Sequence, residues 1–275
     1  MRFQASLSTM RLTWSSAAIA GAVLAAAIAF PFIRKDYQIF LRGGPSYAPQ
    51  NLRGYIIVLV LALFRGEEKG LAIYEQLPEK RAWLPELPKR NGDRPKTTSH
   101  IIQRQASTAL PSYAPPLTLA QLNQYPDPEF VDKSLKGMVI PRVQARHEST
   151  TQLALSKFEF HATAIFVLPD MPIDNPKHIP SHDTVRRTKR EVAHMHDYHD
   201  CTLHLALAAQ DGRQVLEKGW GQRHPLAGPG MPGPPTEWTF IYAPRDEEEV
   251  KVVETIVEAS IAYMTNAEKP VKLVE

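Results

Sequence analysis

The chain has 275 residues, of which 43% are hydrophobic, and a formal net charge of +3. This length and apolar content fit one sizeable core with an accessory region and argue against two full domains, while the interspersed acidic and basic residues give no reason to expect nucleic-acid binding. The single cysteine, Cys201, excludes an internal disulfide and fits a reducing compartment.

The N-terminal segment changes character abruptly. Residues 1–13 form a polar and basic leader, whereas residues 14–33 carry no charge and are rich in Ala and Ile. A helix of that length, rising about 1.5 Å per residue, crosses a hydrocarbon core of about 30 Å. A cleaved secretory signal is the alternative, but we favour a retained anchor because the apolar segment is longer than that of a typical signal peptide. The basic residues that follow predict a single-pass endomembrane protein whose remaining chain faces the cytosol.

Residues 34–105 are expected to form a helical accessory region. Within it, the apolar run Tyr55–Phe64 is too short to span a bilayer as a helix, so it is a core or interfacial helix. Gly70–Leu84 predicts another helix, interrupted by a proline. Residues 106–137 are rich in proline and have no strong period, which indicates an insertion at the surface.

Residues 138–275 are expected to form the catalytic domain. Lys157–Leu168 alternates polar and apolar side chains and predicts a strand in the centre of a sheet. Trp238–Tyr242, rich in aromatic and β-branched residues, predicts the last strand, and Asp246 is expected to cap a helix with an apolar face. Helices around a mainly antiparallel sheet give an α+β fold, preceded by the N-terminal transmembrane helix.

The stretch Glu191–Gly228 holds five of the ten histidines of the chain. His194 and His196 would share one face of a strand, and His204 would alternate with leucines in the next run. The two runs predict a hairpin with one apolar and one histidine-bearing face, with its turn at Asp197–Asp200 and with Cys201 as a small buried residue inside a strand.

The segment after this hairpin contains several helix and strand breakers. Asp211 and Gly212 are expected to end the second strand, and Gln214–Lys218 to form a short helical turn. The glycines and proline that follow would leave three side chains on a constrained loop: Trp220, Arg223 and His224.

Histidine clusters serve as metal sites or as general bases, and each histidine can instead be purely structural. HExxH and paired CxxC motifs are absent from the sequence, so we expect no metal. A metal-dependent dioxygenase with His194, His196 and His204 as ligands stays open as an alternative. GxGxxG after a strand, a P-loop and a cysteine cluster are also absent, so we expect no nicotinamide, flavin or iron–sulfur cofactor.

The chain resembles the fungal luciferases in three segments around these histidines: SHDTVRRTKREVAHMHDYHDCTLHLALAAQDG (Ser181–Gly212), GWGQRHPLAGPG (Gly219–Gly230) and WTFIYAPR (Trp238–Arg245). The similarity extends over most of the remaining chain, including GPSYAPQNLRGYIIV (Gly44–Val58) and KFEFHATAIF (Lys157–Phe166). Residues 106–137 are the segment that does not match the family pattern.

This resemblance implies a luciferase that oxidises 3-hydroxyhispidin, a hydroxylated pyrone with a catechol tail. The reaction uses O2 through a peroxide intermediate and releases CO2, light and a caffeoylpyruvate-type product. Removing the acidic enol proton makes an enolate that can itself donate an electron to O2, so a cofactor-independent route is chemically plausible. The protein then needs a base, donors for the developing negative charge and a dry pocket.

Alternation along the hairpin assigns candidate roles. We predict that His194 or His196 is the base, with the other histidine and His204 orienting it, and that Arg223 and His224 stabilise the oxyanion. The predicted substrate-binding residues are His199, Trp220, Trp238 and Tyr242. The expected partners are the pyrone, O2 and the lipid bilayer through residues 14–33. A membrane-tethered polyphenol-binding protein without turnover is the alternative from another class.

Overall fold

The computed structural model describes residues 4–42, 48–64, 68–95, 97, 123–171, 181–196, 200–228 and 233–275. The helices in these ranges are α1 (Gln4–Arg42), α2 (Leu52–Ala62), α3 (Ala72–Gln76), α5 (Pro128–Phe130), the π-helix η1 (Val131–Leu135), α6 (Val139–Ala145), α7 (Ser181–Arg187), α8 (Ala209–Lys218) and α9 (Glu247–Met264). The strands are β1 (Thr151–Leu155), β2 (Thr163–Val167), β3 (Glu191–Met195), β4 (Leu203–Ala206), β5 (Gly221–Arg223) and β6 (Trp238–Ile241).

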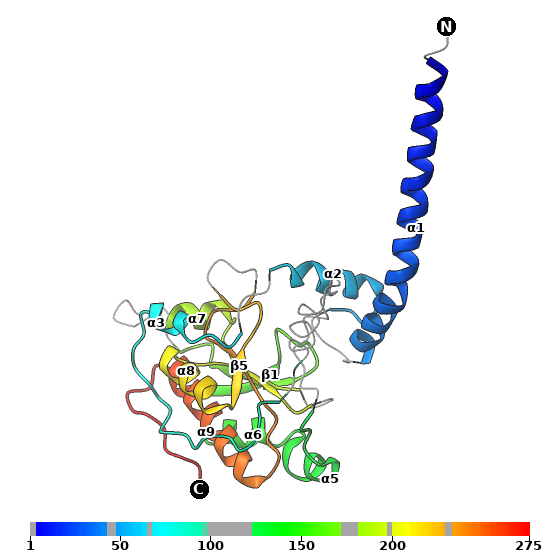
Figure 1. Cartoon of the computed structure of the whole chain (residues 1–275). Coiled ribbons are helices and arrows are strands. Elements are labelled where there is room, and N and C mark those ends of the chain that lie inside the picture. The colour runs from blue at the N-terminus through cyan, green and yellow to red at the C-terminus, as the bar shows by residue number, and fades with distance from the viewer. Residues whose placement is uncertain are drawn as a thin grey trace.

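The strands form one six-stranded sheet in the order β1-β2-β3-β4-β6-β5, and every neighbouring pair is antiparallel. Helices pack on this sheet, which confirms the predicted α+β fold (Figure 1). The hairpin of β3 and β4 is also confirmed. Its register pairs Ala193 with Leu205 and His194 with His204, so apolar and histidine side chains emerge on opposite faces.

One face of the sheet is covered by helices. α9 contacts β3 and β4, α6 contacts β1, β2 and β3, and α7 packs against α9. As predicted, the Asp246 side chain caps α9 by accepting a hydrogen bond from the backbone N–H of Glu249 at 2.9 Å. The Ser260 hydroxyl on α9 donates to the carbonyl of Ala206 at 2.6 Å, which fixes the helix to the sheet in addition to the apolar packing.

The prediction of a central strand over Lys157–Leu168 is wrong. β2 begins at Thr163 and lies second from the edge, and residues 157–159 form a turn between β1 and β2. The Ser156 hydroxyl accepts hydrogen bonds from the backbone N–H groups of Phe158 and Glu159, and the Glu191 carboxylate accepts one from Lys157. These side chains take the backbone donors that a strand ladder would have used.

Three smaller predictions, for the hairpin and for the segment between it and the last strand, are also wrong. Asp211 and Gly212 lie inside α8 instead of breaking the chain, and a Cβ at position 212 would lie 3.0 Å from the Tyr74 ring, so a larger residue would require that ring to shift. Arg223 ends the edge strand β5 and is not on a loop. Cys201 is buried as expected, but it lies between β3 and β4 with a φ of 53°.

Part of the predicted accessory region packs on the sheet domain. Tyr74, Trp83 and Leu87 belong to the same hydrophobic core as the strands. The Asp211 carboxylate accepts hydrogen bonds from the backbone N–H groups of Trp83 and Leu84 at 3.0–3.1 Å, which fixes this segment against α8. The proposed domain boundaries stay predictions, and residues 106–122 of the proline-rich insertion lie outside the described residues.

The N-terminal helix α1 is longer than expected. It runs from Gln4 to Arg42 and projects away from the rest of the protein (Figure 1). Its segment Ala18–Gln38 is long and apolar enough to cross a membrane, and most of its described side chains are exposed while none is fully buried. The basic pair Arg34 and Lys35, at which the predicted segment 14–33 ends, does not interrupt the helix, and the bounds of the anchor stay a prediction.

Helix α2 lies crosswise near the C-terminal end of α1 (Figure 1). Tyr55 on α2 packs against Phe40 of α1, with their ring centroids 5.8 Å apart. The other face of α2 is unusually apolar for an exposed surface: Leu52, Ile56 and Val60, spaced by four residues, are 60%, 52% and 50% exposed.

Candidate functional site

Three histidines meet on the sheet face that the helices leave uncovered. His194 on β3 pairs with His204 on β4, and His196 follows β3 directly. The ring centroid of His204 lies 5.3 Å from that of His194 and 4.9 Å from that of His196. The structure thus brings together the three imidazoles that alternation placed on one face, while their chemical roles stay a prediction.

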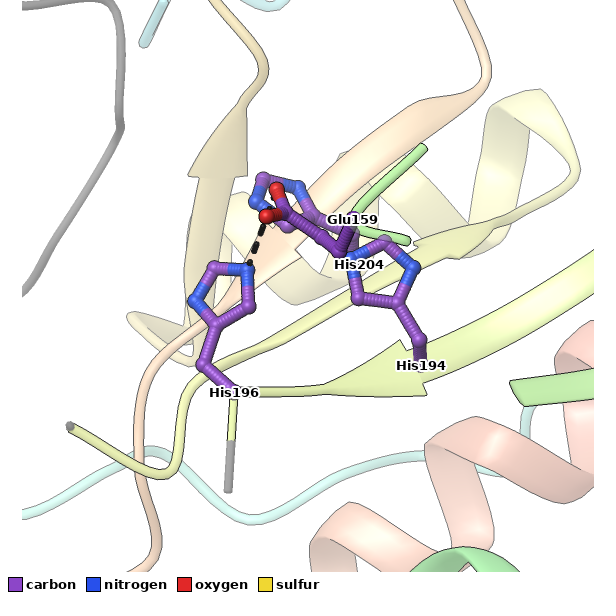
Figure 2. Close-up of side chains that lie close together, drawn as sticks. All are labelled: Glu159, His194, His196 and His204. Carbon is purple, nitrogen blue, oxygen red and sulfur yellow. Dashed lines mark ion pairs between the residues drawn. The ribbon is translucent and has the colours of Figure 1, made fainter. Parts of the chain in front are cut away.

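A fourth side chain, Glu159, reaches this cluster from the turn between β1 and β2 (Figure 2). Its Oε1 lies 3.7 Å from Nε2 of His196. Glu159, His194, His196 and His204 each offer one ligand-type atom, and these four atoms all lie within 4.8 Å of one another. Sequence reasoning missed Glu159 because this segment was interpreted as a strand. Ser156, three residues earlier, was the local signal for a turn.

His194 is fixed by a buried carboxylate. Its Nδ1 lies 2.7 Å from Oε1 of Glu191, and neither side chain is appreciably exposed. Because a carboxylate accepts hydrogen bonds, Nδ1 is the donor in this contact, and a neutral His194 ring has its lone pair on Nε2. The same carboxylate accepts from the Ser156 hydroxyl at 2.8 Å and from the Lys157 backbone N–H at 2.6 Å. Glu191 therefore positions both His194 and the turn that carries Glu159.

His196 is held in a similar way through a hydroxyl. The Thr202 hydroxyl donates to Oδ1 of Asp200 at 2.7 Å, so its oxygen accepts the hydrogen bond from Nδ1 of His196 at 3.0 Å. Burial lowers the pKa of His196, but the hydrogen bonds and negative charges of Asp200 and Glu159 outweigh it and raise the pKa to about 10. The pKa of Glu159 is lowered, because the interactions with His196 outweigh its desolvation.

His204 is the neutral member of the cluster. Burial, together with the charges of His196, His224 and His194, holds its pKa well below the ordinary value. Within the described part of the chain, three buried ring nitrogens lack a hydrogen-bond partner: Nε2 of His194, Nε2 of His196 and Nδ1 of His204. Buried polar atoms are rarely left in this state, so these nitrogens are candidates for ligand contacts.

Two aromatic side chains enclose the cluster. Trp238 on β6 lies nearly parallel to the His204 ring, with an interplanar angle of 5° and a centroid distance of 6.3 Å. Phe158 from the turn packs on Trp238 at 5.0 Å. Of the predicted substrate-binding residues, Trp238 is thus placed beside the histidines, and Phe158 is an addition that sequence reasoning did not identify.

Trp220 and Tyr242 lie elsewhere on the sheet. Phe240 separates Tyr242 from His204, because its ring centroid is 5.3 Å from His204 and 5.9 Å from Tyr242. The guanidinium of Arg90 lies 5.8 Å from the Trp220 ring and 5.7 Å from the Tyr242 ring. These two residues line a separate aromatic and cationic contact and are not brought to the histidine cluster.

The two predicted oxyanion donors are placed differently. The His224 ring meets the His204 ring edge to face at 5.3 Å, so His224 adjoins the cluster. Arg223 pairs in register with Thr239. Along β6, the side chain of Thr239 points to the face opposite to that of its neighbours Trp238 and Phe240, and Arg223 shares the face of Thr239. The register therefore does not bring Arg223 to the cluster. His199 lies outside the described residues.

The arrangement supports two kinds of chemistry. A buried imidazole nitrogen with a lone pair and a carboxylate-fixed ring can accept a proton from a substrate. The same lone pairs, converging with a carboxylate, can bind a metal ion. Both kinds of chemistry use the same nitrogen atoms.

Comparison with known proteins assigns the chain to a family. A family model described as a luciferase domain matches residues 189–260, which include the three cluster histidines. A luciferase from Armillaria gallica is 70% identical over 251 residues, covering 91% of this chain and 88% of that protein. A luciferase from Neonothopanus nambi is 66% identical over 272 residues, covering 97% and 96%. No solved structure matches the chain. The chain belongs to the fungal luciferase family.

Proposed function

We propose that this protein is a luciferase that oxidises 3-hydroxyhispidin with O2 through a peroxide intermediate, and that it releases CO2, light and a caffeoylpyruvate-type product. Family membership makes it an oxidoreductase of the oxygenase type. The substrate and products are what the resemblance to fungal luciferases implies. The structural observation that supports a reaction centre is the cluster of three imidazoles inside the matched domain, of which His194 and His204 are buried and His196 is partly buried.

The first requirement of this chemistry is removal of the enol proton from the pyrone. The cluster fits this requirement at His194, whose Nε2 is buried and lacks a hydrogen-bond partner in the described part of the chain, whereas the raised pKa of His196 keeps that ring protonated at neutral pH. In both rings the other nitrogen is fixed, by Glu191 in one case and by Thr202 in the other. A fixed ring holds its free nitrogen in one direction, which is what proton transfer needs.

The second requirement is a dry and positively charged environment for the enolate and the peroxide. His194 and His204 are 1% and 4% exposed, the ring of Trp238 adjoins both, and Phe158 packs on Trp238. The raised pKa of His196 keeps positive charge at the cluster at neutral pH. A buried positive charge stabilises a developing oxyanion more than an exposed one does, because water does not screen it.

We further propose that α1 anchors the protein in a membrane as a single pass, with the sheet domain on the cytosolic side. The exposed apolar surface of Ala18–Gln38 supports the anchor. The exposed row of Leu52, Ile56 and Val60 on α2 supports a second contact, in which α2 lies along the membrane interface.

The test uses the purified full-length chain in detergent micelles or nanodiscs, mixed with 3-hydroxyhispidin in air. We expect light, O2 uptake and CO2 release in proportion to the amount of enzyme. Binding of the pyrone without O2 uptake would instead support a polyphenol-binding protein. His147→Ala is the matched control, because His147 is a partly exposed histidine at the end of α6, remote from the cluster.

A further inference from the structure

We propose that Glu159, His194, His196 and His204 form a binding site for one divalent first-row transition-metal ion. The sequence lacks the familiar metal motifs, and on that ground no metal was expected. The folded chain assembles a donor set that those motifs do not describe, because Glu159 comes from a turn 35 residues before His194 in the sequence.

The chemistry of the four donors selects the class of ion. Three imidazoles with one carboxylate suit iron, manganese, cobalt, nickel, copper or zinc, whereas magnesium and calcium prefer oxygen ligands. The four ligand atoms lie within 4.8 Å of one another. Ligands about 2.1 Å from a shared ion are separated by roughly 3 to 4 Å, so small rotations of the side chains bring the four atoms into one coordination shell.

The groups behind the ligands give an independent reason. A histidine that binds a metal through one nitrogen usually donates the N–H of the other to a carboxylate, a carbonyl or water. His194 donates from Nδ1 to Glu191. His196 donates from Nδ1 to the Thr202 hydroxyl, which in turn donates to Asp200. The rings of His194 and His196 are thus both oriented by a hydrogen-bond acceptor, as metal-binding histidines usually are.

The ring nitrogens that remain are the ones a metal would use. Nε2 of His194 and Nδ1 of His204 are buried and have no hydrogen-bond partner among the residues that the structure describes, and Nε2 of His196 faces Glu159 in an ion pair at 3.7 Å, too long for a hydrogen bond. Purely structural histidines in a core satisfy both ring nitrogens, since a buried polar atom without a partner is destabilising. Three such atoms on three adjoining rings indicate a shared ligand.

The charge around the cluster also favours a cation. Glu159 belongs to the cluster itself, and the buried carboxylates of Glu191 and Asp200 stand directly behind two of its imidazoles. A doubly charged ion at the centre would interact favourably with all three carboxylates at short range in a medium of low dielectric constant.

A six-coordinate ion with four protein ligands keeps two positions open. The adjacent hydroxyl and carbonyl oxygens of a 3-hydroxypyrone form a bidentate oxygen donor that suits two such positions. This step rests on the proposed function, whereas the metal site itself does not. Because the pyrone is not needed for metal binding, the two proposals can be tested separately.

The first experiment measures metal content without substrate. Full-length protein is purified in detergent without chelators and analysed by inductively coupled plasma mass spectrometry, with a chelator-stripped sample for reloading. We expect roughly one transition-metal ion per chain, lost on stripping. His204→Leu and Glu159→Gln should lower the content to background, and His147→Ala should retain it. Melting temperatures of all variants show whether each is folded.

The second experiment reloads the stripped protein with Co(II), and in parallel with Fe(II), Mn(II) or Zn(II). Co(II) bound by nitrogen and oxygen ligands should give visible d–d absorption that saturates at one equivalent. Glu159→Gln, which changes a side chain in a turn and preserves its shape, should weaken Co(II) binding by more than about 10-fold.

Two results would overturn the metal site: protein that binds none of these ions after stripping, or equal Co(II) spectra and affinities in the wild type, Glu159→Gln and His204→Leu. Light from metal-free protein would also remove the metal from the reaction while leaving the proposed function intact. Conversely, stoichiometric metal without light from 3-hydroxyhispidin would keep the site and reject the proposed substrate.

Discussion

The two faces of the sheet are built from the same strands and differ in almost everything else. On β4, Leu205 points to the side covered by α9, and His204 points to the other side. The helix-covered face buries aliphatic side chains, whereas the opposite face buries imidazoles, carboxylates and aromatic rings. Neighbouring residues along a strand therefore have different roles: one stabilises the fold through its packing, and the next belongs to the candidate site.

The largest effect should come from the histidine-bearing face. In His194→Ala we expect the rate of light production to fall by about 100-fold to 10,000-fold, the range for loss of a residue that handles a proton in the reaction. Some loss of stability should accompany this fall, because the substitution leaves the buried Glu191 carboxylate without its partner Nδ1. The measurement is initial light intensity per folded protein, beside the melting temperature. A bright His194→Ala variant would show that this face is not the reaction centre.

The helix-covered face should respond in the opposite way. Leu205 is fully buried in the main core, so Leu205→Ala should lower the free energy of unfolding by about 2–5 kcal/mol. The fraction that remains folded should keep its specific activity. Denaturant unfolding and light output on the same samples test this. Loss of activity without loss of stability would mean that the two faces are coupled more closely than we infer.

A buried carboxylate on α8 should make the stability of the fold depend on pH. Burial raises the pKa of Asp211 to about 6, against the opposing effect of hydrogen bonds from Trp83 and Leu84. Between about pH 4 and pH 6 the folded chain holds a proton that the unfolded chain has released, so stability falls as the pH rises through this window. The loss is on the order of 2 to 3 kcal/mol.

Asp211→Asn should remove this fall in stability with pH. The measurement is the free energy of unfolding of the wild type and of the variant at several pH values from 4 to 7, and the difference between the two should change across this range. Light output per folded molecule should follow the wild-type profile, because Asp211 contacts the segment Trp83–Leu84 and not the histidines. Parallel pH curves of stability for the two proteins would contradict the assignment.

The smallest effect is expected from a positioning residue. Thr202→Val removes the hydroxyl that accepts from His196 and should reduce light output by about 10-fold to 100-fold. Thr202→Ser restores the hydroxyl and should restore most of the activity. If Ser and Val variants are equally impaired, the methyl group and its packing matter more than the orientation of His196.

The features of the fold and of the site that depend on residues close together in the sequence could be predicted from the sequence. The hairpin of β3 and β4 follows from alternation within a short segment, and the cap of α9 follows from Asp246 and the acidic turn after it. Both are local patterns. The convergence of His194, His196 and His204 was predictable for the same reason.

The errors share a different cause. The turn at residues 157–159 depends on Glu191, which lies more than 30 residues away and accepts a hydrogen bond from the Lys157 backbone. Glu159 could not be recognised as part of the site until that turn was known. Likewise, Gly212 can occupy a helix beside the Tyr74 ring, a contact that no local propensity reveals.

The exposed row on α2 has a practical consequence for shortened forms of the protein. A chain that begins after α1 would still carry Leu52, Ile56 and Val60 on its surface, so it should attach reversibly to liposomes or aggregate in plain buffer. Shortening the chain alone would not give a well-behaved reagent. Replacing these three side chains by polar ones is the change that the arrangement of α2 recommends to anyone who wants to express the enzyme as a soluble reporter. Tyr55 needs replacement as well, because removal of α1 uncovers the ring that packs against Phe40.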